Sequence, residues 1–258
     1  MHMNRRQFVK NLGLGTASLS MGSLVTASSC APSGDSSLKQ NVKEGEDGQF
    51  LFIGDDIAIA QTEYGKVQGY LLNHVYTFLG VPYGADTSGK NRFMPPQKPE
   101  PWTDVRPAVF YGNTAPQRME NRWPNNYGTF ADHWNYWDVS EDCLYLNVWT
   151  PGIADGKKRP VLVWLHGGGF TNGSGIEQDG YHGENISREG DIVFCSINHR
   201  LGPIGFSDLS GVGGEAYKDS GNVGMLDIIA ALRWVHDNIA NFGGDPGNGC
   251  NSGSFLIH

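Results

Sequence analysis

The twelve residues "RPVLVWLHGGGF", Arg159 to Phe170, join an apolar run directly to three glycines. The unbroken apolar stretch predicts a strand buried on both faces, as in a sheet flanked by helices. Gly167 to Gly169 follow without Cβ atoms, so their backbone N–H groups can turn inward. Such donors can hold the negative oxygen of a tetrahedral acyl intermediate. A glycine-rich turn that only packs against the sheet is the alternative interpretation.

The segments on either side alternate between strand and helix patterns. "CLYLNVWTP" at 143–151 and "DIVFCSINHRLG" at 191–202 predict two further strands, and 177–190 between them predicts a helix with loops. A longer helix is predicted by apolar residues at three- and four-residue steps. These are Met225, Ile228, Ile229, Leu232, Val235 and Ile239. Gly243, Gly244 and Pro246 end this helix.

This alternation predicts an α/β fold with a mostly parallel sheet and flanking helices. Ahead of it, residues 57–84 alternate short apolar runs with glycine, which is typical of antiparallel hairpins. Residues 84–139 are rich in Pro, Asn, Trp and Tyr and predict loops. The sequence shows no internal repeat.

Composition narrows the class of protein. The chain has 258 residues, a formal net charge of -8 and 39% hydrophobic residues, enough to bury a large core. The acidic balance argues against a nucleic-acid partner, because phosphate binding needs clustered Lys and Arg. No His/Cys/Asp spacing predicts a metal site, and no cofactor is implied.

The first residues predict a targeting segment. Arg5-Arg6 precede a weakly apolar run that is too short and too polar to span a bilayer, so residues 1–29 predict a twin-arginine-like export signal. Cys30 follows Ala-Ser-Ser as in a lipoprotein cleavage site, which would attach the protein to a membrane through a lipid. Ordinary cleavage nearby is the alternative. We expect residues 30–48 to be a flexible tether, and the product to be periplasmic or lipid-anchored outside the cytoplasmic membrane.

Several separated segments resemble the type B carboxylesterase family, relatives of the cholinesterases, and they occur in the family's order. They are "GKVQG" at 65–69, "FLGVPYG" at 78–84, "NRFMPPQKPEPW" at 91–102, "SEDCLYLNVWTP" at 140–151, "HGGGF" at 166–170, "SINHRLGPIGF" at 196–206 and "GNVGMLDIIAALRWVHDNIANFGGDPGN" at 221–248. The resemblance spans about residues 56–248. It implies the N-terminal part of an α/β-hydrolase fold within residues 49–258.

The resemblance also implies roles for individual residues. Gly168 and Gly169 match the family's oxyanion-hole donors, and Arg92 and Glu141 match a structural ion pair. Cys143 matches a cysteine that the family often bridges to an earlier one, but Ala115 stands at the earlier place, so we expect a buried thiol. Asn198 and Arg200 match structural positions, and we expect Cys195 to pack within its strand.

The histidines invite a catalytic interpretation that the pattern does not favour. We expect His166 to shape the glycine loop, and His182, His199 and His236 to be core or surface residues.

The family continues from F-G-G-D-P-x-N into a strand and then a G-x-S-x-G turn that presents the nucleophile. Here "GCNSGSFLIH" at 249–258 follows, and no G-x-S-x-G occurs in the 258 residues. We therefore expect the strand, the nucleophile, the acid and the base all to be absent and the chain to be inactive. Read one base later, codons for Gly249–Gly253 permit x-Val-Thr-Val, so we hypothesise a frameshift.

Two functions of different class follow. By lineage the chain is a carboxylic ester hydrolase whose partner is a small-molecule ester. The alternative is an exported, non-catalytic, cholinesterase-like binding or adhesion module.

Overall fold

The computed structural model describes residues 50–118 and 138–253. The chain divides into two compact units, Met1–Lys43 and Glu44–His258, and every described residue belongs to the second. The predicted export signal and the whole predicted tether, including Cys30, lie outside the described residues.

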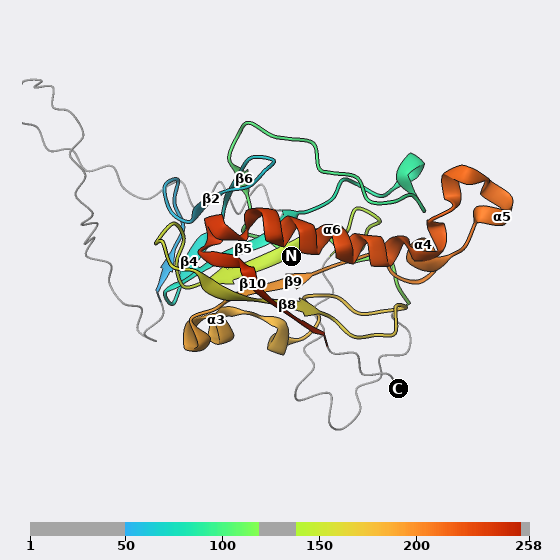
Figure 1. The fold of residues 1–258 in the computed structure, drawn as a ribbon. Coiled ribbons are helices and arrows are strands. Elements are labelled where there is room, and N and C mark those ends of the chain that lie inside the picture. Colours follow the sequence, from blue (N-terminus) through green and yellow to red (C-terminus); the bar gives the residue numbers. More distant parts are fainter. Residues whose placement is uncertain (1–49, 119–137, 254–258) are drawn as a thin grey trace, which may run out of the picture. The chain divides into compact units, whose positions relative to one another are not determined.

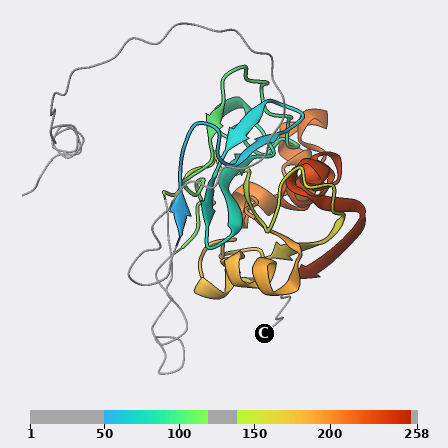
Figure 2. The same cartoon turned by 90° about the vertical axis from the view of Figure 1, so that its left-hand side faces the viewer.

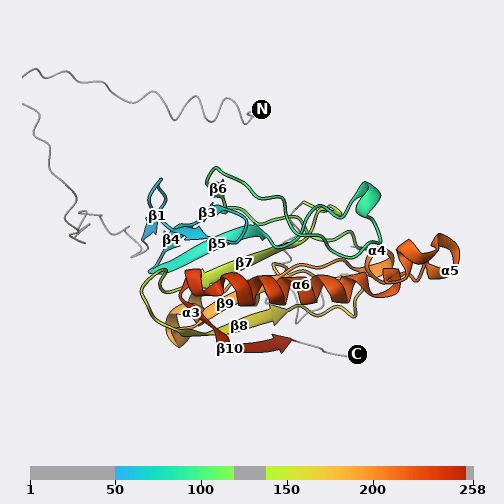
Figure 3. The same ribbon diagram turned by 45° about the horizontal axis from the view of Figure 1, so that its top comes forward.

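A seven-stranded sheet forms the centre of the described part, in the order β1-β4-β5-β7-β9-β8-β10 (Figure 3). Its strands are β1 (Leu51–Phe52), β4 (Tyr70–Leu72), β5 (Val75–Pro82), β7 (Tyr145–Thr150), β8 (Arg159–Leu165), β9 (Val193–Ile197) and β10 (Gly244–Gly253). β7, β8 and β9 fall inside the three predicted strand segments. All five residues of β9 are buried, as a strand covered on both faces requires.

The sheet is mixed rather than mostly parallel. Within this sheet the pairs β1-β4, β4-β5, β5-β7 and β7-β9 are antiparallel, and the pairs β9-β8 and β8-β10 are parallel. The connections differ accordingly: a tight turn at Asn73-His74 joins the antiparallel strands β4 and β5, whereas helices lie between β8 and β9 and between β9 and β10. The predicted α/β class holds, and the antiparallel hairpin region extends further into the sheet than expected.

The predicted hairpins also build a second, small sheet. It contains β2 (Ile59–Gln61), β3 (Lys66–Gln68) and β6 (Arg106–Pro107), with β2-β3 antiparallel and β3-β6 parallel. Gly69 separates β3 from β4 where the backbone passes against Thr77, leaving no room for a Cβ atom. Residues between 84 and 139 are mostly loop in the described part, as predicted.

Helices cover opposite faces of the large sheet. α6 (Val223–Asn238) lies along one face and α3 (Glu184–Gly190) under the other (Figures 1 and 2). Strand residues divide accordingly, because successive side chains point to opposite faces. Val148 and Cys195 join the core beneath α6, whereas Trp149 and Phe194 form the smaller core on the side of α3.

The predicted apolar face of α6 is buried at Ile228, Val235 and Ile239, with Met225 and Leu232 packed against the core, and only Ile229 departs from it. Ile229 is 42% exposed, whereas Asp227, Ala231, Trp234 and Asn238 are buried. Asp227 lies on the same buried side because it meets Arg200, a charged partner that a hydrophobic pattern does not register. Gly243 then ends the helical segment with φ 77°, as predicted.

Short helical turns connect the larger elements. They are η1 (Gly89–Asn91), η2 (Asp179–Tyr181), α4 (Gly202–Phe206), α5 (Ser210–Gly213), η3 (Glu215–Tyr217), η4 (Ser220–Asn222) and η5 (Ile239–Phe242). No helix in the described ranges has the length and apolar character needed to cross a membrane.

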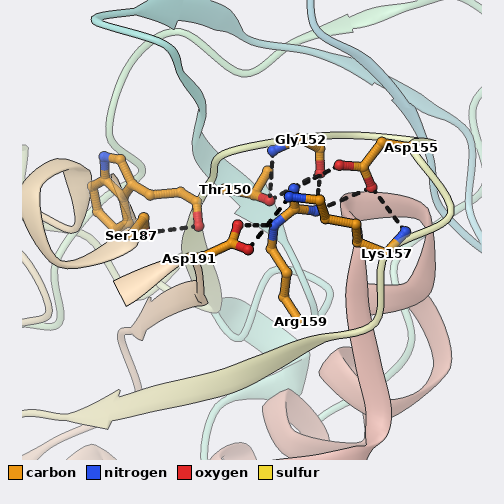
Figure 4. A network of polar contacts seen from close by, with 8 residues as sticks. Thr150, Gly152, Asp155, Lys157, Arg159, Ser187 and Asp191 are labelled. Atoms are coloured by element: carbon orange, nitrogen blue, oxygen red, sulfur yellow. Dashed lines mark hydrogen bonds and ion pairs between the residues drawn. The ribbon is translucent and has the colours of Figure 1, made fainter. Parts of the chain in front are cut away.

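A buried guanidinium fastens the start of β8 to its surroundings (Figure 4). Arg159, 3% exposed, donates to Asp155 Oδ2 at 2.6 Å, to Asp191 Oδ1 at 2.7 Å and to the Gly152 carbonyl at 3.3 Å. Its own N–H donates to the Gly243 carbonyl at 3.1 Å, just before β10. Three chain segments therefore meet at Arg159, opposite the end of β8 that leads into the glycines.

Candidate functional site

The glycine loop begins directly after β8, at the carboxyl end of the strand. Gly168 and Gly169 are exposed and have φ 116° and 59°, a region that side chains disfavour. At Gly168 a Cβ atom would also collide with the carbonyl oxygen of Asn172, whereas at Gly169 there is open space. The requirement for glycine is thus steric at Gly168 and conformational at Gly169.

The carbonyl groups of the loop fix the direction of its N–H groups. The Gly167 carbonyl lies 2.8 Å from His166 Nδ1, and the Gly168 carbonyl accepts from Thr171 N at 3.1 Å and from Asn172 N at 3.3 Å. All described peptide bonds are trans, so each N–H points opposite to the carbonyl of the same peptide plane. The N–H groups of Gly168 and Gly169 therefore point away from the interior of the loop.

These two donors are free to meet a ligand. Within the described ranges, no acceptor takes the N–H of Gly168 or of Gly169. Adjacent backbone donors aimed outward from one turn form a cradle for a developing negative charge.

Gln117 closes the far side of the loop. Its side-chain amide makes two bonds to Gly173: Nε2 donates to the Gly173 carbonyl at 2.9 Å, and Oε1 accepts from the Gly173 N–H at 2.8 Å. The Gly202 N–H donates to the Phe170 carbonyl at 2.7 Å and ties the loop to the start of α4. The glycine loop is thus held from both sides by segments distant in sequence.

A cavity of about 410 Å³ adjoins the loop. Its walls come from residues 116–118, 171–172 and 202–203. Two of these wall residues, Thr171 and Asn172, also hold the Gly168 carbonyl. The space therefore begins beside the cradle and can receive part of a small molecule bound there.

Strand β10 brings the chain back to the glycine loop, which corrects one expectation. The strand expected to be absent is present: Cys250, Asn251, Ser252 and Gly253 pair in parallel with Leu162, Val163, Trp164 and Leu165 of β8. Backbone pairing to the open edge of β8 does not need the apolar side chains that the family pattern has there.

The end of β10 lies beside the end of β8, where the glycine loop starts. A G-x-S-x-G turn that began at Gly253 would have its serine at position 255, where the sequence has Phe255, and its last glycine at 257, where it has Ile257. Ser254 and Phe255 lie outside the described residues. The backbone thus leads to the place of a nucleophile, and the residue types do not supply one.

The structure places the other predicted residues as follows. Arg92 Nε and Glu141 Oε2 form an ion pair of 2.7 Å on the surface, joining the turn η1 to the segment before β7. Cys143 and Cys195 are buried free thiols, and burial raises the pKa of both. Arg92 and Glu141 lie apart from the glycine loop in the chain and serve the scaffold.

The structure places His182, His199 and His236 in the core or at the surface, as expected. His199 is buried and His236 exposed, while His182 packs its ring edge on Trp149 at 5.3 Å. The described ranges contain no group of three His, Cys, Asp or Glu side chains that could hold a metal ion.

The fold and the loop define a class of protein. A central sheet with helices on both faces, a glycine loop after one strand and a neighbouring parallel strand that ends beside it are the elements of an α/β-hydrolase. The chain belongs to the carboxylesterase family, whose model matches residues 56–253.

Known relatives agree with this assignment. The chain is 42% identical over 193 residues to the para-nitrobenzyl esterase of Bacillus subtilis and 45% identical over 188 residues to the phenmedipham hydrolase of Pseudarthrobacter oxydans. These matches cover 74% and 73% of this chain but 36% and 35% of the relatives. The chain therefore spans about a third of the length of the curated relatives that it matches.

Solved structures show the same fold. An esterase from Clostridium hathewayi, described as able to hydrolyse aliphatic aromatic polyesters, matches with a TM-score of 0.72 and 41% identity. This match covers 80% of the present chain and 39% of that chain. A carboxylesterase from Geobacillus stearothermophilus matches with a TM-score of 0.67 and 42% identity, covering 76% and 37%.

Two features of the site escaped the sequence patterns. The two hydrogen bonds between Gln117 and Gly173 join loop residues 56 positions apart, and no local periodicity marks such a pair. The rings of His166 and His199 stack with their centroids 4.8 Å apart, and no sequence pattern predicts this contact either. Only the strand-to-glycine junction carried a signal strong enough to find the site.

Proposed function

We propose that this chain carries the oxyanion-binding part of a carboxylic ester hydrolase. The observation that supports the proposal is the outward direction of the Gly168 and Gly169 N–H groups, set by the carbonyls that precede them. In the complete protein, a small carboxylic ester would bind with its carbonyl oxygen at these donors. Attack on the carbonyl carbon places a negative charge on that oxygen, and the two N–H groups stabilise it.

The remaining chemistry belongs to residues that this sequence does not hold at the expected positions. A serine hydroxyl, activated by a histidine and an acid, would attack the ester carbonyl and release the alcohol, and water would then release the acyl group. Phe255 stands where a turn starting at Gly253 would place that serine. We therefore propose that the 258 residues alone do not hydrolyse esters through a triad.

A chimera tests the proposed function. It joins residues 49–248 of this chain to the remainder of the Bacillus subtilis para-nitrobenzyl esterase, starting at the position equivalent to Gly249. We expect the chimera to hydrolyse p-nitrophenyl butyrate, with inhibition by a serine-reactive phosphonate, and the 258-residue chain to give no phosphonate-sensitive hydrolysis. Sensitive turnover by the chain alone would refute its inactivity, and a folded but inert chimera would refute the proposed role of the loop.

The alternative is an exported binding or adhesion module without catalysis. The same two proteins separate the possibilities. A binding module should be monodisperse and melt cooperatively as the 258-residue chain, because its fold would be complete. In the described part of the chain β10 pairs only with β8, and the hydrolase proposal expects its other edge to cause association of the isolated chain, which light scattering measures.

We also propose that the protein is exported and that Cys30 receives a lipid. The supporting features are the Arg5-Arg6 pair, the weakly apolar run and the Ala-Ser-Ser-Cys sequence. Metabolic labelling with a fatty acid should mark the wild-type protein and not Cys30→Ala. Labelling of both, or of neither, would reject the lipid attachment.

A further inference from the structure

Two imidazole rings stack beneath the glycine loop. The rings of His166 and His199 lie 4.8 Å apart between centroids with an interplanar angle of 11°. His166 is 9% exposed and His199 is 4% exposed, so both rings are buried. One ring immediately precedes the glycines and the other follows β9, so the stack joins the ends of neighbouring strands.

Each ring is also bonded to backbone. His166 Nδ1 lies 2.8 Å from the Gly167 carbonyl, and His199 Nδ1 lies 2.9 Å from the Arg200 carbonyl. A carbonyl oxygen only accepts hydrogen bonds, so both Nδ1 atoms carry a hydrogen. The position of the His199 ring is thus fixed by its own backbone, and it offers a flat surface to His166.

The contacts continue from the stack to the Gly168 donor. His166 holds the Gly167 carbonyl, and the Gly168 N–H belongs to the same trans peptide plane. Glycine on both sides of this peptide leaves the plane free to rotate unless something holds it. The direction of the Gly168 N–H therefore depends on the His166 ring, and the ring depends on its neighbour.

We propose that His199 is a positioning residue for the Gly168 N–H, that it acts through the His166 ring, and that protonating His199 releases this donor. The proposal rests on the proposed function only in taking the Gly168 N–H as a donor to the oxyanion. It concerns loop geometry, which can be measured in the chain itself.

Charge is the reason for the dependence on pH. The neutral rings stack, but a proton on His199 would place a buried cation against the face of a second imidazole. Burial lowers the pKa of His199, while the Arg200 carbonyl and Asp227 act in the opposite direction. In the described part of the chain the charged groups beside His199 are Asp227 and Arg200, and these two are paired with each other at 2.6 Å.

Amide resonances of the isotope-labelled 258-residue chain, recorded at concentrations below the onset of association in light scattering, test the proposal. His199→Phe keeps a flat ring, and His199→Ala removes it. We expect the Gly168 amide cross-peak to stay near its wild-type position in His199→Phe and to lose that position in His199→Ala. Rescue by the aromatic variant would not follow from a general loss of stability. If His199→Ala does not fold, the Gly168 amide position in His199→Phe and the wild-type titration still test the proposal.

In the titration, the Gly168 amide and the His199 Cε1–H of the wild-type chain should share one midpoint, below the ordinary value for histidine. His236→Gln, at an exposed ring on α6, should leave the Gly168 profile unchanged. The proposal is overturned by a Gly168 amide that ignores the His199 titration, by an unchanged position in folded His199→Ala, or by equal disturbance in His199→Phe. None of these results bears on the chimera assay, so the two proposals fail separately.

Discussion

Arg200 and Asp227 form a bidentate ion pair that is closed to solvent. Nε donates to Oδ2 at 2.8 Å and Nη2 donates to Oδ1 at 2.6 Å, with the two side chains 1% and 0% exposed. The Arg200 N–H also donates to Asp227 Oδ2 at 3.0 Å. This pair fixes the end of β9 against α6 and lies next to the His166–His199 stack.

Removing one partner of this pair should be far worse than removing both. Asp227→Ala leaves a buried guanidinium without its counter-ion, and we expect a loss of about 3–5 kcal/mol in the free energy of unfolding. Arg200→Met combined with Asp227→Leu should lose much less. Urea denaturation of the two single variants and the double variant gives the coupling energy. Strictly additive losses would contradict the structural interpretation.

Acid should weaken the Arg159 cluster. Hydrogen bonds from Arg159 are the largest cause of the lowered pKa of Asp155 and of Asp191. A carboxylate with a lowered folded-state pKa stabilises the fold above its unfolded pKa, about 3.9, and this stabilisation is lost as pH falls through the folded value.

We therefore expect stability to fall more steeply below about pH 4 in the wild type than in Asp155→Asn/Asp191→Asn. Urea denaturation at several pH values measures this. Asp55→Asn, an exposed site outside the cluster, is the control. Parallel pH curves for the wild type and the double variant would show that the cluster does not titrate as described.

Gln117 should hold the glycine loop closed. Gln117→Ala removes both bonds to Gly173, at an expected cost of about 1–2 kcal/mol, and should speed hydrogen exchange of the Gly173 amide. Gln97→Ala is the matched control, because Gln97 is exposed and its side chain donates only to the nearby Pro95 carbonyl, at 3.0 Å. Unchanged protection of Gly173 in Gln117→Ala would argue against this role.

The two buried thiols should not react with disulfide reagents in the native protein. Burial raises the pKa of Cys143 and Cys195, which keeps them protonated, and the reactive species is the thiolate. In a Cys30→Ser/Cys250→Ser background, a disulfide reagent at mildly alkaline pH should label neither residue until urea unfolds the chain. Rapid labelling under native conditions would contradict their burial.

Sequence patterns predicted the parts of the fold that depend on continuous apolar runs. β7, β8 and β9, the helix ended by Gly243 and the glycine loop all lie where the residues indicated. Patterns failed where a polar contact or backbone pairing decides the outcome. Asp227 is buried on the core side of α6 because it pairs with Arg200, and β10 forms from small polar residues because β8 offers an edge for backbone pairing.

The site was predictable in the same uneven way. Glycines after a buried strand marked the donors, because few other structures require that combination. Their orientation was not predictable, since it depends on His166, Gln117 and His199, which the fold brings together from three separate segments.

The central claim is that the Gly168 and Gly169 N–H groups form a working oxyanion cradle. The most direct test is the kcat of the chimera with p-nitrophenyl butyrate before and after Gly168→Ala, with Gly211→Ala as control because a Cβ atom there meets nothing within 4 Å. The added Cβ atom collides with the Asn172 carbonyl and displaces the Gly168 N–H, which should lower kcat by about 100-fold to 1,000-fold in Gly168→Ala and leave the control unchanged. A kcat for Gly168→Ala equal to that of the parent chimera would contradict the account.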